Sequence, residues 1–236
     1  GPLEEKLKRE EGDYREFLLM HRNAKRLERL IDQLLDLSRI ESGQLELHII
    51  RDNITKHIKA FVSSFSSYAD QQDIALDTDF SDDNELGYFD PDKLEKIVYN
   101  LLSNAFKFTP QGGKISVRTA IRGHRIYMKI TDTGRGMTNE EASQIFNRFY
   151  RSQSSIKSEI EGLGIGLALT RELIILHGGE ISVQSKPNQG STFEFELPIG
   201  KEYYNKTKIE EVSTSLNSVS KIETEESVTN ESLLES

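Results

Sequence analysis

Apolar residues recur at helical spacing between residues 14 and 42 of the chain. Leu27, Leu30 and Leu34 belong to a wide stripe with i, i+3, i+4, i+7 spacing, which predicts one long amphipathic helix. Gly43 follows, at a position where glycine commonly ends a helix. Such a helix cannot bury its stripe alone, so we expect it to be one helix of a hairpin in a four-helix bundle.

The rest of the chain alternates between strand-like and helix-like patterns. Period-two alternation predicts strands at about residues 45–49, 74–80, 87–89, 114–120, 126–130, 180–185 and 192–197. Helical spacing, capping residues and glycine stops predict helices at about 52–69, 90–108 and 165–177, with a short one after 138. The pattern indicates an α+β fold, a two-layer α/β sandwich in which three helices cover one face of a mixed sheet of about five strands.

The periodic pattern ends near residue 200. From Lys201 onward the chain is rich in Ser, Thr, Glu and Asn, a composition that buries too little apolar surface to offset the entropy of ordering. The sequence therefore predicts three parts: a helical segment at 1–43, the sandwich at 44–199, and a disordered acidic linker or tail at 200–236.

Composition narrows the functional classes. The 236 residues carry a formal net charge of −9, which argues against a nucleic-acid binder because such proteins present a basic face. The sequence has no cysteine, so disulfides, thiol chemistry and cysteine-ligated zinc are excluded. No apolar run approaches membrane-spanning length, and we expect a cytoplasmic location.

Polar side chains share one face of the predicted helix at 90–108. Asn100, Asn104 and Lys107 follow i, i+4, i+7 spacing. Amide oxygens suit Mg²⁺, which takes few protein ligands and shares phosphate oxygens, and lysine suits a phosphate as a point charge. Taken alone, these three residues fit a solvated helix face equally well.

A carboxylate stands at the end of the strand near 126–130. Asp132 is followed by Gly134 and Gly136, which let the backbone approach a flat ligand closely. An ionised carboxylate only accepts hydrogen bonds, so it suits an exocyclic amine such as that of adenine. An ordinary surface turn is the alternative for this motif alone.

Two further patches follow. Phe146 and Phe149 flank Arg148 beside a serine-rich segment, where they can brace a loop or simply fill a core. Residues 162–167 form a glycine-rich loop that opens a helix and offers free N–H groups to phosphate. A loop rather than a strand precedes these glycines, so a Rossmann dinucleotide site is excluded.

In this order and spacing, the four patches resemble the asparagine, phenylalanine and two glycine boxes of two-component sensor histidine kinases. That family shares its Bergerat-type ATP-binding fold with gyrase, the Hsp90 chaperones and MutL. Gly190-Ser191-Thr192-Phe193 also looks like the family's short Gly-Thr-x-Phe element, and residues 23–43 look like the second helix of its dimerisation and phosphotransfer hairpin. The resemblance covers about residues 15–198.

The resemblance implies ATP and Mg²⁺ as ligands. Asp132 would accept the adenine amino group, Asn104 with Asn100 would hold Mg²⁺, and Lys107 and Arg148 would reach phosphates. Residues 151–164 would form a lid. The implied nucleotide-binding residues are Asn100, Asn104, Lys107, Phe108, Asp132, Gly134, Gly136, Arg148, Phe149, Gly162, Leu163, Gly164, Ile165, Gly166, Leu167 and Thr192.

The chain departs from the family at the phosphoacceptor. No histidine stands on a first hairpin helix with an acidic residue after it; His21 lies on the second helix and is followed by Arg22. We therefore expect a fragment that binds ATP but does not phosphorylate itself. The resemblance also implies a homodimer through the N-terminal helix, relay to a response regulator or fused receiver domain, and a parent protein anchored in the inner membrane.

Three alternatives stay open at this point. A regulatory pseudokinase would bind nucleotide without transferring phosphate. An ATPase clamp of the Hsp90 or MutL kind would need a glutamate at the position of Asn100 to activate water. A serine kinase of the same superfamily would have no use for the hairpin helix around Leu27.

Overall fold

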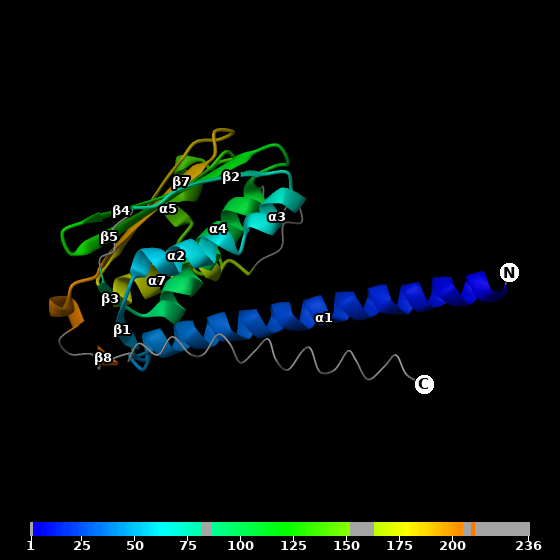
Figure 1. The fold of residues 1–236 in the computed structure, drawn as a ribbon, viewed down its shortest axis with the longest axis horizontal. Helices are drawn as coiled ribbons and strands as arrows, with labels where there is room; N and C mark the ends of the chain where they lie inside the picture. The colour runs from blue at the N-terminus through cyan, green and yellow to red at the C-terminus, as the bar shows by residue number, and fades with distance from the viewer. Residues whose placement is uncertain (1, 82–85, 152–162, 205–208, 211–236) are drawn as a thin grey trace, which may run out of the picture.

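The structure, a computed structural model, describes residues 2–81, 86–151, 163–204 and 209–210 (Figure 1). Its helices are α1 (Pro2–Glu41), α2 (Ile54–Ser63), α3 (Ser66–Gln71), α4 (Pro91–Phe108), α5 (Asn139–Gln144) and α7 (Gly166–Leu176). Its strands are β1 (Ile49–Asp52), β2 (Ala75–Asp79), β3 (Gly87–Phe89), β4 (Lys114–Arg122), β5 (Arg125–Asp132), β6 (Glu180–Ser185), β7 (Ser191–Pro198) and β8 (Ile209–Glu210), with a 3₁₀ turn, η1, at Lys201–Tyr204.

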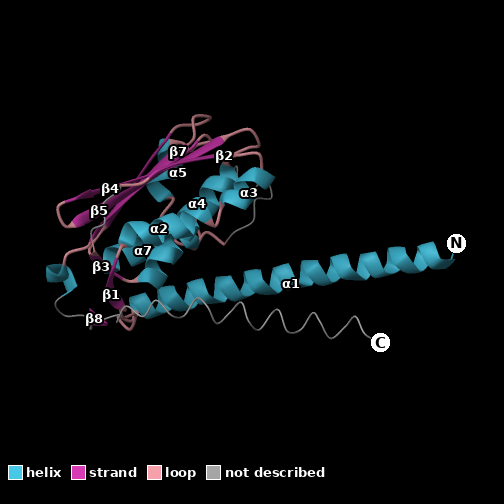
Figure 2. Ribbon diagram, viewed as in Figure 1, coloured by secondary structure: helices cyan, strands magenta, loops and turns pink. Residues whose placement is uncertain are grey.

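The main sheet has five strands in the order β2-β4-β5-β7-β6. β2 runs parallel to β4, and the other neighbours are antiparallel, so the sheet is mixed. Helices α2, α4 and α7 cover one face of this sheet, and their apolar sides form the core against it (Figure 2). The expected α+β two-layer sandwich is confirmed.

The local sequence explains where α4 begins. Asp90 accepts a hydrogen bond from the Lys93 N–H at 3.0 Å and caps the helix, and Pro91 occupies the first helical position, where no N–H is needed. Asp90 also accepts the N–H of His48 at 2.8 Å. One buried carboxylate thus fixes both the start of α4 and the chain entering the domain.

Two predicted elements have different bounds in the structure. The strand expected at 45–49 starts only at Ile49 and pairs with β3 outside the main sheet. The single helix expected at 52–69 divides into α2 and α3. At the break, the Ser64 hydroxyl donates to the Phe61 carbonyl oxygen at 2.7 Å, a local bond of the kind that competes with helix continuation.

The segment after residue 200 is not wholly without structure. Tyr204 is 3% exposed, and its hydroxyl donates to the Pro198 carbonyl oxygen at 2.8 Å. β8 pairs in parallel with β1, with Ile209 opposite Ile49. Burial of the Tyr204 ring offsets the ordering entropy that the composition implied, so the prediction of disorder is wrong for 201–204 and 209–210. The remainder of the predicted tail lies outside the described residues.

Helix α1 packs on the domain only near its C-terminal end, while its N-terminal part extends well beyond the domain (Figure 1). Leu37 is 3% exposed against the domain core, whereas Leu27, Ile31 and Leu34 are 49–59% exposed. Only the C-terminal end of the predicted stripe therefore packs on the domain. The rest of the stripe forms an exposed apolar face on α1. No helix in the described part of the chain is long and apolar enough to cross a membrane.

Candidate functional site

One cavity of about 370 Å³ lies between α4, the residues after β5, the start of α7 and the adjoining side of α1. It collects residues from all four predicted patches, because Tyr150 and Arg151, which directly follow Phe149, line it together with residues of the other three. The predicted site residues that line it are Asn100, Asn104, Lys107, Phe108, Asp132, Gly136, Leu163, Gly164, Ile165, Gly166 and Leu167.

Asp132 is a buried residue of the cavity wall. The residue is 5% exposed, and its Oδ1 accepts the N–H of Gly134 at 2.8 Å and the N–H of Ser191 at 3.2 Å. Burial raises the pKa of this carboxyl group, and the two N–H donors oppose that rise only in part. Two backbone donors thus hold the carboxylate in one orientation within the cavity wall.

The backbone around Asp132 is packed too closely for side chains. Gly136 has φ +64°, and a Cβ there would overlap the carbonyl oxygen of Lys186. Gly190 has φ +81°, and a Cβ there would overlap the carbonyl oxygen of Asp132. Glycine is required at both positions by conformation and by space, so the turn between β6 and β7 lies directly on the loop after β5.

The polar face of α4 forms the opposite wall. Asn100 is 7% exposed, and its Nδ2 donates at 3.4 Å both to the Gly166 carbonyl oxygen and to the Thr170 hydroxyl. Its Oδ1 accepts a hydrogen bond from Gln33 of α1 at 3.3 Å. Asn100 therefore links α4 to both α7 and α1, whereas Asn104 lines the cavity one turn later.

Cationic side chains surround one aromatic ring of the cavity. The Arg135 guanidinium lies 4.7 Å from the Phe108 ring centroid, and Lys107 Nζ lies 5.4 Å from the same centroid. Arg29 and Arg151 also line the cavity. Four cationic residues around one cavity suit an anionic ligand such as a polyphosphate. Among the described residues, no three His, Cys, Asp or Glu side chains form a metal cluster.

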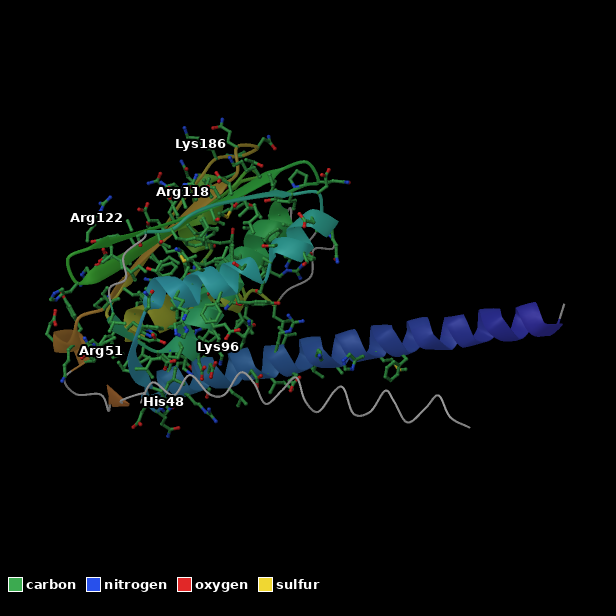
Figure 3. All side chains as sticks on the ribbon, in the orientation of Figure 1. His48, Arg51, Lys96, Arg118, Arg122 and Lys186 are labelled. Atoms are coloured by element: carbon green, nitrogen blue, oxygen red, sulfur yellow. The ribbon has the colours of Figure 1, made fainter. Side chains whose placement is uncertain are left out.

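A line of polar contacts joins α1 to α4. Arg29 Nη1 donates to the Tyr99 hydroxyl at 2.7 Å, Gln33 donates to Asn100, and Lys96 pairs with Asp36; Lys96 is labelled in Figure 3. We call these three pairs the polar seam. Residues 29, 33 and 36 are spaced i, i+4, i+7, so one face of α1 supplies all three contacts.

Some predicted site residues lie elsewhere. Arg148 pairs with Glu41 at the end of α1 and does not line the cavity, because that carboxylate offers it a direct ion-pair partner. Phe149 is 65% exposed and also lies outside the lining. The Thr192 hydroxyl bonds that of Thr131 at 3.0 Å, while the adjacent Ser191 reaches the cavity. Gly134 does not line the cavity either, but its N–H donates to Asp132 Oδ1.

Most of the predicted lid lies outside the described residues. This part includes Gly162 and most of the segment at 151–164.

Sequence reasoning also missed residues that line the cavity. The unpredicted lining residues include Arg29, Gln33, Tyr99, Arg135, Met137 and Ser191. Ser191 belongs to the Gly190-Ser191-Thr192-Phe193 element, but the resemblance of that element led us to select Thr192 as the site residue. The lining residues on α1 have no local sequence signal.

The model of the histidine kinase-, DNA gyrase B- and HSP90-like ATPase family matches residues 89–201. Residues 89–201 belong to this ATPase family. The match includes α4, Asp132 and the start of α7, which are the elements that build the cavity. The resemblance to histidine kinase ATP-binding domains is confirmed.

Two similar proteins are named as histidine kinases. Histidine kinase P4 of Formosa agariphila is 34% identical over 215 residues, which make up 89% of this chain and 16% of the relative. The circadian input-output histidine kinase CikA of Synechococcus elongatus is 35% identical over 201 residues, 84% of this chain and 26% of the relative. This chain thus spans a minor part of the length of these relatives.

A solved structure has a similar fold. Full-length ShkA in complex with AMPPNP superimposes with a TM-score of 0.64 at 27% sequence identity. The superposition covers 74% of this chain and 36% of ShkA. The shared fold therefore extends beyond the 89–201 match.

Proposed function

We propose that this chain is the ATP-binding catalytic part of a two-component sensor histidine kinase. It binds Mg-ATP in the cavity beside α4 and presents the γ-phosphate to a histidine supplied outside this sequence. A response-regulator aspartate would then receive the phosphoryl group. The observation that carries the proposal is a buried carboxylate held by two backbone donors at one end of a cavity lined by cationic residues.

The residues of the cavity would divide the nucleotide between them. Asp132 accepts the adenine amino group, because an ionised carboxylate offers only acceptors. Phe108 lies near the base, and Lys107 and Arg135 neutralise phosphate charge. The residues from Leu163 to Leu167 provide backbone N–H groups at the start of α7, a helix end that favours phosphate.

The donor set of α4 also fits Mg²⁺. Asn104 and Asn100 would offer amide oxygens to a metal ion whose other ligands are phosphate oxygens and water. Mg²⁺, when bound, would neutralise charge that develops on the transferring phosphoryl group. Because Gln33 contacts the Asn100 oxygen, Asn104 is the more accessible of the two candidate ligands.

The proposal also concerns the phosphoacceptor histidine and the homodimer. None of the five histidines, all of which lie in the described residues, lines the cavity. The exposed apolar face of α1, which includes Leu27 and Leu34, would pack against a second copy to form the hairpin bundle of a homodimer. The acceptor histidine would lie on the companion helix of that bundle.

Calorimetric titration of Mg-ATP into the chain tests nucleotide binding. We expect saturable binding by the parent, and a large loss of affinity in Asp132→Ala and in Asn104→Ala. Asp79→Ala, on the exposed edge strand β2, serves as a control that should bind like the parent. Absence of binding by a folded parent chain would contradict the proposal.

Incubation with γ-labelled ATP tests the transfer step. The chain alone should acquire no acid-labile label, whereas addition of a histidine-bearing hairpin helix from a relative should yield label on that helix. Stable label on His21 of the chain itself would contradict the proposed location of the acceptor.

A further inference from the structure

Three residues form a row across the main sheet beside the cavity. Asp132 on β5 stands opposite Ser191 on β7, and Ser191 stands opposite Ser185 on β6. Asp132 and Ser191 line the cavity, whereas Ser185 lies one strand further away and does not. The row therefore connects the candidate adenine-reading carboxylate to the outer strand of the sheet.

The Ser185 hydroxyl joins three separate backbone segments. It donates to the Gly190 carbonyl oxygen at 2.8 Å and accepts the N–H of Met137 at 2.8 Å. It also lies 3.0 Å from the Ser191 hydroxyl. A hydroxyl has one hydrogen, so once Ser185 donates to Gly190, Ser191 must be the donor in the serine pair.

These contacts control the geometry of Asp132. Gly190 directly precedes β7 and Ser191 begins it, and the Ser191 N–H is one of the two donors that hold Asp132 Oδ1. Met137 follows Gly136, whose backbone packs against the turn between β6 and β7. One hydroxyl thus holds the loop after Asp132 and the strand opposite Asp132 in fixed relation.

We propose that Ser185 is a positioning residue for nucleotide selection, which keeps the Asp132 carboxylate aligned to accept an adenine amino group. The inference rests on the proposed binding of ATP. It assigns Ser185 no contact with the nucleotide, because the side chain acts through Ser191, Gly190 and Met137. The effect of its loss should therefore fall on the base rather than on the phosphates.

Discrimination between two nucleotides separates positioning from general support. Guanine carries a carbonyl oxygen where adenine carries the amino group, so an aligned carboxylate repels GTP and accepts ATP. A structural defect would weaken both nucleotides in proportion. A misaligned Asp132 would weaken the binding of ATP more than that of GTP. The dissociation constant of GTP divided by that of ATP would then fall.

The test is titration of Mg-ATP and Mg-GTP into the parent chain, Ser185→Ala, Ser185→Thr and Ser182→Ala. We expect the preference for ATP to fall about tenfold in Ser185→Ala, since several hydrogen bonds are lost together. Ser185→Thr retains the hydroxyl and should recover most of the preference. Ser182→Ala, on the exposed face of the same strand, should keep the parent's preference.

The outcomes are separable from those of the proposed function. If the parent fails to bind ATP, the proposed function falls; if the parent binds and Ser185→Ala retains the full ATP preference, only the present inference is overturned. Should thermal unfolding show that Ser185→Ala does not fold, Ser191→Ala removes the serine–serine bond alone. In Ser191→Ala the preference for ATP over GTP should fall about threefold, and an unchanged preference would overturn the inference.

Discussion

The two ends of the cavity are built in different ways. At the adenine end, where we propose that Asp132 binds adenine, the carboxylate is buried and glycines leave no space for adjustment. Along the polar seam, the contacts join flexible side chains of α1 and α4. From this difference we expect that the adenine end stays fixed, whereas α1 and α4 can separate at the seam without either helix unfolding.

The largest expected effect comes from neutralising the rigid end. Asp132→Asn should weaken ATP binding by about a hundredfold, because a charge-assisted acceptor is lost and an amide N–H₂ can face the adenine amino group. Calorimetry with ATP provides the measurement, and Asp79→Asn is the matched control. An unchanged affinity would remove Asp132 from the reading of the base.

The same substitution should leave the fold intact or strengthen it. Burial raises the pKa of Asp132 above its ordinary value of 3.8, so the ionised group costs folding free energy at neutral pH. The amide oxygen of Asp132→Asn still accepts both backbone N–H bonds without that cost. Thermal unfolding should show Asp132→Asn at least as stable as the parent at pH 7, with the difference disappearing below about pH 3.8.

The raised pKa also predicts how ATP binding depends on pH. A protonated Asp132 presents a donor to the adenine amino group, so affinity should fall on acidification at a higher pH than for an ordinary aspartate. Titrations from neutral pH down toward the ordinary aspartate value of 3.8 measure this fall. An affinity that, in a folded chain, begins to fall only at that ordinary value would contradict the prediction.

Steric filling of the rigid end should come next. Gly136→Ala adds a Cβ that overlaps the Lys186 carbonyl oxygen at φ +64°, so we expect about 2–4 kcal/mol of lost stability. Gly123→Ala has a similar φ of +58° with nothing within 4 Å of the new Cβ, and it should lose only about 1 kcal/mol. Equal losses in denaturant unfolding would show that packing at the adenine end is not the cause.

Effects at the polar seam should be smaller and of opposite sign for binding. Gln33→Ala frees the Asn100 oxygen, so Mg-ATP affinity should rise by about threefold if the nucleotide and α1 compete for that residue. Asp32→Ala, an exposed neighbour on α1, is the control. A lower affinity in Gln33→Ala would mean that the seam supports the nucleotide.

The smallest effect is expected at the edge of the seam. Asp36→Asn removes the charge that pairs with Lys96, whose side chain is 40% exposed, so we expect a stability loss of about 1 kcal/mol and unchanged ATP affinity. Amide hydrogen exchange should quicken in the C-terminal part of α1. Unchanged exchange there would show that Asp36 does not hold α1 on the domain.

Prediction from sequence succeeded where the signal is local. The caps and apolar spacing of α4 placed Asn100, Asn104 and Lys107 on one cavity wall, and the strand before Asp132 placed its carboxylate at another. The seam was missed because Gln33 and Asn100 are 67 residues apart and only tertiary packing brings them together. The ion pair of Arg148 with Glu41 was missed for the same reason, since Glu41 lies on α1.

The pairing of β8 with β1 has a mechanical consequence. β1 receives the chain as it leaves α1, and Ile209 of β8 lies beside Ile49 of β1. The polypeptide therefore enters and leaves the ATP-binding domain through neighbouring strands of one small sheet. Any rotation of the domain about the junction at Gly43 would therefore turn both connections around nearly the same pivot, and neither would be stretched.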